Sequence, residues 1–94
     1  MADNALPVLI LGLGKVGSLT ARLLAETGFK ATGASRTGIE LAGVDTISLD
    51  VDKQDELIKT LEGHWAVVSC LPYHRNLAVA SAAHKLGIHY FDLT

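Results

Sequence analysis

Two nearly continuous apolar runs dominate the hydrophobic pattern of this 94-residue chain. The first runs from Val8 to Leu11, directly after Pro7, and the second runs from Trp65 to Leu71. Strands that are buried on both faces, as in parallel sheets, carry runs of this kind. The pattern therefore predicts two central strands that lie side by side.

Between and after these runs, apolar residues recur at helical spacing in three segments. A helix is expected over residues 15–27, with Gly28 ending it and with its apolar face on the sheet: Val16, Leu19, Leu23 and Leu24. A second helix is expected after Asp52 as its N-cap, with Gly63 as its stop and with a buried stripe of Leu57, Ile58 and Leu61. An alanine-rich third helix is expected over residues 74–86, closed by Gly87.

Further strands are predicted at residues 29–34, 44–51 and 88–91. The link from Thr37 to Gly43 is shorter than the ten or so residues that a helical crossover needs, so at most one helical turn is expected there. The alternation of elements predicts an α/β fold, namely a Rossmann-type doubly wound parallel sheet in the order 3-2-1-4-5 that stops after its fifth strand.

Three glycines follow the first strand at the spacing G-x-G-x-x-G: Gly12, Gly14 and Gly17. The first allows a tight turn, the second lets backbone approach a pyrophosphate, and the third lets helix and strand pack closely. The helix that follows would direct its free N–H groups at the phosphates. The motif predicts a dinucleotide site, and the alternative is an ordinary strand-to-helix turn that binds nothing.

The residues after the second strand bear on the choice of cofactor. NAD-binding versions of this fold place an acid there, whereas this chain has Ser35, Arg36 and Thr37. An arginine fork with two hydroxyl groups would hold a 2′-phosphate, so NADP is predicted over NAD. The alternative is that Arg36 is a solvated turn residue. Asp50, after the third strand, is read equally well as an acceptor for the adenine amino group or as a turn residue.

Composition and charge exclude several functions. The chain is 49% hydrophobic with a net charge of -2, which predicts one domain over residues 1–94 and neither a nucleic-acid nor an anionic-membrane partner. One cysteine and no visible secretion signal favour a cytoplasmic location. The four histidines have no metal-ligand spacing, so no metal is expected.

No residue is assigned a catalytic role. Cys70 follows an apolar strand and is interpreted as a small buried hydrophobe. Tyr73 has Leu77 four residues later, so the Tyr-x-x-x-Lys pair of short-chain reductases is absent. Trp65 is expected to pack in the core or at its rim. The ends of strands four and five should face the nicotinamide half of the crevice.

Two further stretches, Ser69–Tyr73 (SCLPY) and His89–Thr94 (HYFDLT), stand beside the glycine motif. Together they resemble the N-terminal NADP-binding domain of the saccharopine dehydrogenase family. The resemblance implies an oxidoreductase that makes or breaks a carbon–nitrogen bond by hydride transfer. It also implies pyrophosphate contacts at Gly12, Gly14, Lys15 and Val16, adenosine-phosphate contacts at Ser35, Arg36 and Thr37, and nicotinamide-side contacts at Leu71, Pro72 and Tyr73.

Members of that family continue into a substrate domain, so this chain is expected to be part of a longer oxidoreductase and to bind cofactor without turning over substrate. The alternative is a non-enzymatic NAD(P)-sensing domain. A third reading, an epimerase- or reductase-like chain, fits the short link but lacks the Tyr-x-x-x-Lys pair. The outer edge of the fifth strand is expected to be free to pair with a second copy of the chain.

Overall fold

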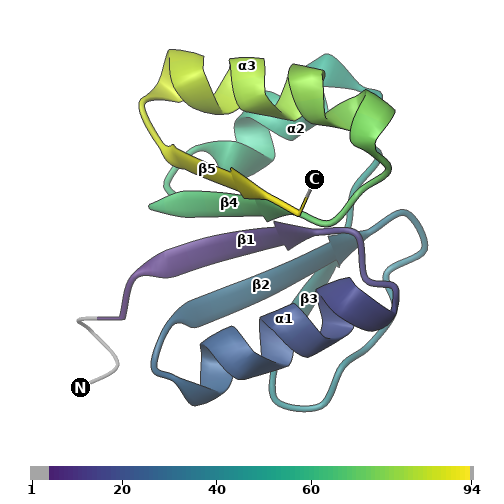
Figure 1. Ribbon diagram of the computed structural model, residues 1–94, viewed down its shortest axis with the longest axis vertical. Helices are drawn as coiled ribbons and strands as arrows, with labels where there is room; N and C mark the ends of the chain where they lie inside the picture. Colours follow the sequence, from purple (N-terminus) through teal and green to yellow (C-terminus); the bar gives the residue numbers. More distant parts are fainter. Residues whose placement is uncertain (1–4, 94) are drawn as a thin grey trace.

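The computed structural model describes residues 5–93, and the domain predicted over residues 1–94 extends beyond them at both ends. A five-stranded parallel sheet in the order β3-β2-β1-β4-β5 forms the middle layer (Figure 1). This is the predicted order. The elements are β1 Pro7–Leu11, α1 Lys15–Glu26, β2 Lys30–Ser35, β3 Asp45–Ser48, α2 Gln54–Leu61, β4 Ala66–Ser69, the 3₁₀ turn η2 Tyr73–Arg75, α3 Asn76–Leu86 and β5 His89–Asp92.

Strand β1 lies at the centre because its side chains are apolar on both faces. Leu9 and Leu11 join the core that lies under α2 and α3, whereas Val8 and Ile10 join the core under α1. Helices therefore cover both faces of the sheet, with α1 on one side and α2 and α3 on the other (Figure 1). Strand order reverses between β1 and β4, which creates the crevice in which this fold class binds ligands.

Helix α1 packs differently from the prediction. Val16, Leu19 and Leu23 are 56%, 53% and 49% exposed, while the helix buries Gly17 and Ala21. A side chain on Gly17 would collide with the turn beneath it, so this helix must face the sheet with its smallest residues. Of the four predicted contact residues only Leu24 packs against the core.

Helix α2 also begins differently from the prediction. Its N-cap position is Lys53, without a capping side-chain hydrogen bond, and Asp52 pairs with Arg75 instead. The third strand is shorter than predicted, and the third helix is preceded by the η2 turn. The link between β2 and β3 holds only a turn closed by a Leu41–Val44 bridge, as its length predicted.

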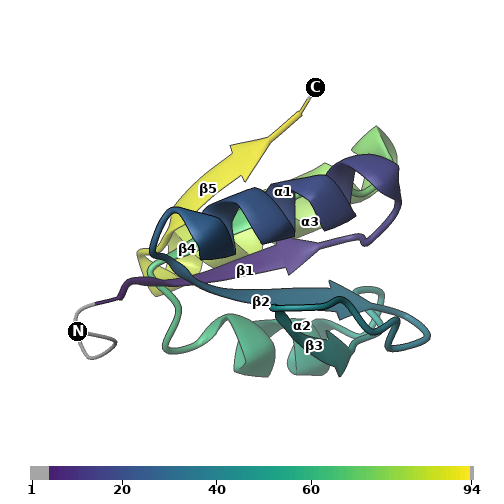
Figure 2. The ribbon, with the colours of Figure 1, turned by 90° about the horizontal axis from the view of Figure 1, so that it is seen from below.

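Strand β5 forms one edge of the sheet, beside β4 (Figure 2). Phe91 on this strand and Leu93 just beyond it are 51% and 58% exposed. Trp65 packs at the rim of the sheet, where its ring stacks on Phe29 with centroids 6.2 Å apart and meets His89 at 4.8 Å. No helix among the described residues is long and apolar enough to cross a membrane.

Candidate cofactor site

The glycine turn between β1 and α1 is shaped by backbone contacts. Gly12 has a φ of +90°, which side-chain-bearing residues rarely adopt, and its N–H donates to the Ala34 carbonyl at 2.9 Å. A Cβ on Gly17 would lie 1.7 Å from the Gly12 carbonyl oxygen. A Cβ on Gly14 would meet no atom within 4 Å. The first and third glycines therefore fix the turn, and the second leaves open space beside it.

The N-terminus of α1 faces that open space with unused donors. The first helical backbone bond is the one from the Ser18 N–H to the Gly14 carbonyl. The N–H groups of the preceding turn have no acceptor within the helix, and Gly14 provides no side-chain cap. No acidic residue lies in the first turn. An anionic group such as a pyrophosphate fits this combination of free donors, positive dipole and absent Cβ.

A cavity of about 310 Å³ opens at this point, and we call it the cofactor cleft. It is lined by residues from the ends of four strands and from the loops that follow them: Gly12, Leu13, Gly14, Ala34, Ser35, Arg36, Ile39, Leu49, Val51, Leu71 and Arg75. The structure thus brings five of the residues predicted from sequence, Gly12, Gly14, Ser35, Arg36 and Leu71, to one cavity. Its mostly apolar lining suits an adenine ring.

Arg36 and Ser35 differ in how firmly they are held. The Arg36 guanidinium is 66% exposed and lies 3.6 Å from an Asp52 carboxylate oxygen and 4.0 Å from one of Asp50. Exposed ion pairs at such separations contribute little, so an incoming phosphate could take over this guanidinium at small cost. The Ser35 hydroxyl accepts a hydrogen bond from the Ile39 N–H at 3.0 Å. Its own hydrogen stays available to a ligand.

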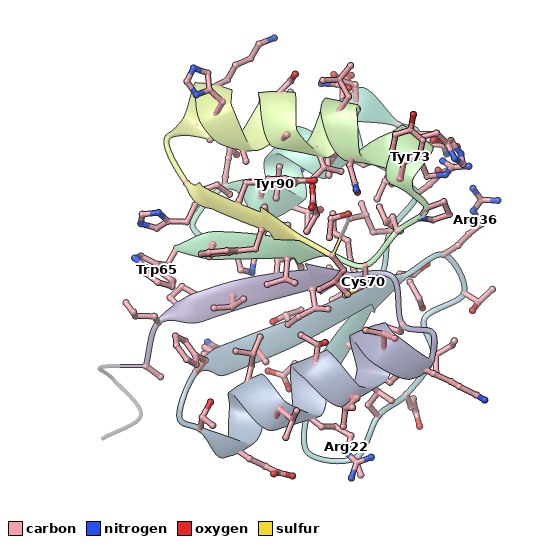
Figure 3. The ribbon with its side chains drawn as sticks, viewed as in Figure 1. Arg22, Arg36, Trp65, Cys70, Tyr73 and Tyr90 are labelled. Carbon is pink, nitrogen blue, oxygen red and sulfur yellow. The ribbon has the colours of Figure 1, made fainter. Side chains whose placement is uncertain are left out.

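The remaining predicted site residues do not line the cleft. Lys15, Val16 and Thr37 are exposed, and Gly17 is buried on the side of α1 that faces the glycine turn. Asp50 accepts a hydrogen bond from the Asp52 N–H at 3.0 Å, which is the turn role that the sequence left open. Pro72 and Tyr73 are exposed, and Tyr73 lies at the same end of the molecule as Arg36 (Figure 3).

At the ends of β4 and β5, polar side chains form a small hydrogen-bonded network against α3. The buried Ser69 hydroxyl donates to Asn76 Oδ1 at 2.7 Å, and the Tyr90 hydroxyl donates to Asp92 Oδ2 at 2.8 Å. Burial and the Asp92 carboxylate raise the pKa of the Tyr90 phenol. Tyr90 points between β5 and α3 (Figure 3). The Tyr90 hydroxyl also lies 3.5 Å from the Asn76 carbonyl oxygen, so the network joins both strands to α3.

Cys70 lies beside the glycine turn (Figure 3), and it is only partly buried. Burial raises the pKa of its thiol, which keeps it protonated and weakly nucleophilic. Among residues 5–93 no group of three or more histidine, cysteine, aspartate or glutamate side chains could hold a metal ion.

Sequence comparison agrees with this geometry. The family model of the saccharopine dehydrogenase NADP binding domain matches residues 8–94. The chain belongs to this family. The match confirms the predicted family. Because the family is described as NADP-binding, it also confirms the predicted cofactor. No curated protein sequence matches the chain.

Solved structures show the same fold. A saccharopine dehydrogenase (L-Glu forming) from Saccharomyces cerevisiae is 28% identical with a TM-score of 0.81, over 94% of this chain and 21% of that one. A D-isomer specific 2-hydroxyacid dehydrogenase from Xanthobacter autotrophicus is 31% identical with a TM-score of 0.73, over 98% and 31%. An NADPH-dependent glyoxylate/hydroxypyruvate reductase from Sinorhizobium meliloti, in complex with NADP, is 34% identical with a TM-score of 0.59, over 71% and 20%. The chain therefore spans a third or less of these proteins.

Sequence reasoning missed six cleft residues of this saccharopine dehydrogenase NADP binding domain, and Arg75 is the charged one among them. It lines the cofactor cleft from η2, and its guanidinium donates to an Asp52 carboxylate oxygen. The sequence gives no sign of this contact, because Arg75 belongs to no motif and its partner lies 23 residues away. The apolar residues Leu49 and Val51 also line the cleft, on either side of Asp50. Their position directly after a predicted strand could have identified them as cleft residues.

Proposed function

We propose that this chain is the NADP(H)-binding domain of a saccharopine-dehydrogenase-like oxidoreductase that acts on carbon–nitrogen bonds by hydride transfer. Its family membership supports the cofactor, and the similarity to the yeast saccharopine dehydrogenase supports the bond type. The nicotinamide of bound NADP would accept the hydride, and that of bound NADPH would donate it. This chain's own residues would bind and orient the cofactor, and the substrate would be handled by residues outside this domain.

The observation that carries the proposal is the pairing of two anion-binding features in one cleft. The glycine turn and the free N-terminus of α1 suit the pyrophosphate, while Arg36 and Ser35 suit the 2′-phosphate of the adenosine half. In this assignment Lys15 and Val16 act through their backbone at the pyrophosphate, and Thr37 adds a hydroxyl beside Arg36. Leu71, Pro72 and Tyr73 border the nicotinamide side.

Calorimetric titration of the 94-residue chain with NADPH and NADH tests the proposal. The parent should bind NADPH more tightly, and Arg36→Ala should reduce that preference by about ten- to a hundredfold, as expected for a lost charged hydrogen bond. Arg22→Ala is the matched control, because Arg22 lies on α1 and points away from the sheet (Figure 3). The phosphate assignment would be contradicted if the ratio of NADPH to NADH affinity were the same in Arg36→Ala as in the parent.

A second measurement addresses the reaction. The isolated chain, mixed with NADP and saccharopine, should produce no reduced nicotinamide, because the roles proposed for its residues are to bind and orient the cofactor and not to protonate or position a substrate. The same domain joined to a following substrate domain should produce it. Turnover by the isolated chain would show that the catalytic groups lie within these 94 residues.

A further inference from the structure

Four charged side chains form a cluster at the outer end of the cofactor cleft: Arg36 after β2, Asp50 and Asp52 after β3, and Arg75 in η2. We call it the charge cluster. Asp52 is its centre, since one of its carboxylate oxygens pairs with Arg75 and the other lies 3.6 Å from Arg36. Both arginines line the cleft, whereas neither aspartate does.

The two arginines are not equivalent partners for Asp52. Arg75 makes a direct hydrogen bond to the carboxylate from a side chain that is 27% exposed. Arg36 makes a longer contact from a side chain that is 66% exposed. A less exposed, hydrogen-bonded pair is less screened by water and salt than a long exposed one. Asp52 is therefore held mainly by Arg75.

This arrangement matters for a phosphate that approaches Arg36. The cluster is neutral as it stands, with two positive and two negative side chains. If Arg75 were removed, the three remaining side chains of the cluster would carry a net charge of -1, and within the cluster Arg36 alone would remain to pair with Asp52. A phosphate would then meet both a competitor for Arg36 and an uncompensated negative charge.

We propose that Arg75 determines the preference for NADP over NAD by acting through Asp52. It is a positioning residue: it holds and neutralises the Asp52 carboxylate, and this leaves the Arg36 guanidinium available to the 2′-phosphate. The inference rests on the proposed NADP binding at Arg36. It differs from two simpler roles, in which Arg75 contacts the phosphate itself or only forms part of the cleft wall.

A double-mutant cycle separates these roles. Arg75→Met, Asp52→Asn and the double variant are titrated with NADPH and with NADH, followed by nicotinamide fluorescence at low and at high salt. Arg75→Met should weaken NADPH by about tenfold, because the Asp52 carboxylate is then uncompensated next to the phosphate site, and should weaken NADH much less. In the Asp52→Asn background the same substitution should have little effect. The NADPH loss should shrink at high salt.

Asp52→Asn alone provides an independent test that does not depend on Arg75→Met folding. It removes the competing charge and should tighten NADPH relative to NADH. Asp55→Asn is its matched control, because Asp55 is an exposed acid in the first turn of α2 and lies outside the charge cluster. It should change neither affinity. Thermal unfolding of each variant shows whether the fold is kept.

Each alternative outcome has a definite meaning. An equal loss of affinity for NADPH and NADH in Arg75→Met would show that Arg75 only forms part of the cleft wall, and would overturn the inference. A loss of NADPH affinity that is just as large in the Asp52→Asn background would indicate that Arg75 contacts the phosphate directly, and would overturn it too. Weaker NADPH binding in Asp52→Asn would overturn it as well. In these cases the proposed function stands. A parent chain that binds neither cofactor would refute the proposed function and the inference together.

Discussion

Replacing Gly17 or Gly14 by alanine should have opposite effects on the stability of the fold. In Gly17→Ala the new Cβ would lie 1.7 Å from the Gly12 carbonyl oxygen and 2.8 Å from its carbon. Real Cβ atoms essentially never approach closer than 3.0 Å, so helix and turn must separate by at least 1.3 Å. The obstacle is backbone, which no side-chain rotation relieves.

The cost can be bounded from these contacts. Overpacking a core costs about 1–3 kcal/mol, and a backbone obstacle puts this site at the upper end. The gain in helix propensity from glycine to alanine returns at most about 1 kcal/mol. The net loss is therefore about 2 kcal/mol, which lowers the melting temperature of a domain of this size by about 8–16 °C.

Gly14→Ala serves as the matched control for stability. Gly14 has a φ of -74°, which alanine adopts readily, and its Cβ would meet no atom within 4 Å. Its melting temperature should match or slightly exceed that of the parent, whereas NADPH binding should weaken because the Cβ projects into the space assigned to the pyrophosphate. The assays are thermal unfolding by circular dichroism and NADPH titration. A Gly17→Ala chain as stable as the parent would refute the reasoning about how this helix is held.

Three further predictions concern the polar network at the ends of β4 and β5 and the outer edge of the sheet. The Tyr90 phenol has a raised pKa, so folding favours its protonated form. Its contribution to the free energy of unfolding is complete below about pH 10, the unfolded value, and decreases as the pH rises from there toward the higher pKa of the folded state, so Tyr90→Phe should flatten this alkaline fall in urea unfolding. Ser69→Ala leaves the buried Asn76 oxygen without its donor and should cost about 1–3 kcal/mol in the same assay, while the exposed Ser81→Ala costs almost nothing. The outer edge of β5 pairs with no strand among residues 5–93, so this 94-residue chain should self-associate, and a sedimentation mass that stays monomeric across a wide dilution range would count against this.

Most of the fold could be predicted from local features of the sequence. The apolar runs at β1 and β4, the glycine motif between β1 and α1, and the stop at Gly87, which has a φ of +72°, all describe features that neighbouring residues enforce. The strand order followed from the handedness of parallel crossovers. These features needed no knowledge of distant contacts.

The errors arose where one specific packing or ion-pair contact outweighed a pattern of residue types. Val16, Leu19 and Leu23 have helical spacing, and so does the other face of α1, which carries Gly17 and Ala21. Hydrophobicity favours the first face, but contact between Gly17 and the Gly12 carbonyl selects the second. Asp52 resembles an N-cap by its place in the sequence, yet a guanidinium 23 residues away takes its carboxylate. The same distance hid Arg75 from the predicted site.

The backbone packing of the glycine turn also bears on how quickly a ligand binds. Gly12 is tied to β2 by its N–H and lies against Gly17, so the turn has its shape before any phosphate arrives. A ready-made loop needs no slow rearrangement and loses little conformational entropy when the ligand docks. Association of NADPH should therefore follow a single fast phase whose rate rises linearly with cofactor concentration.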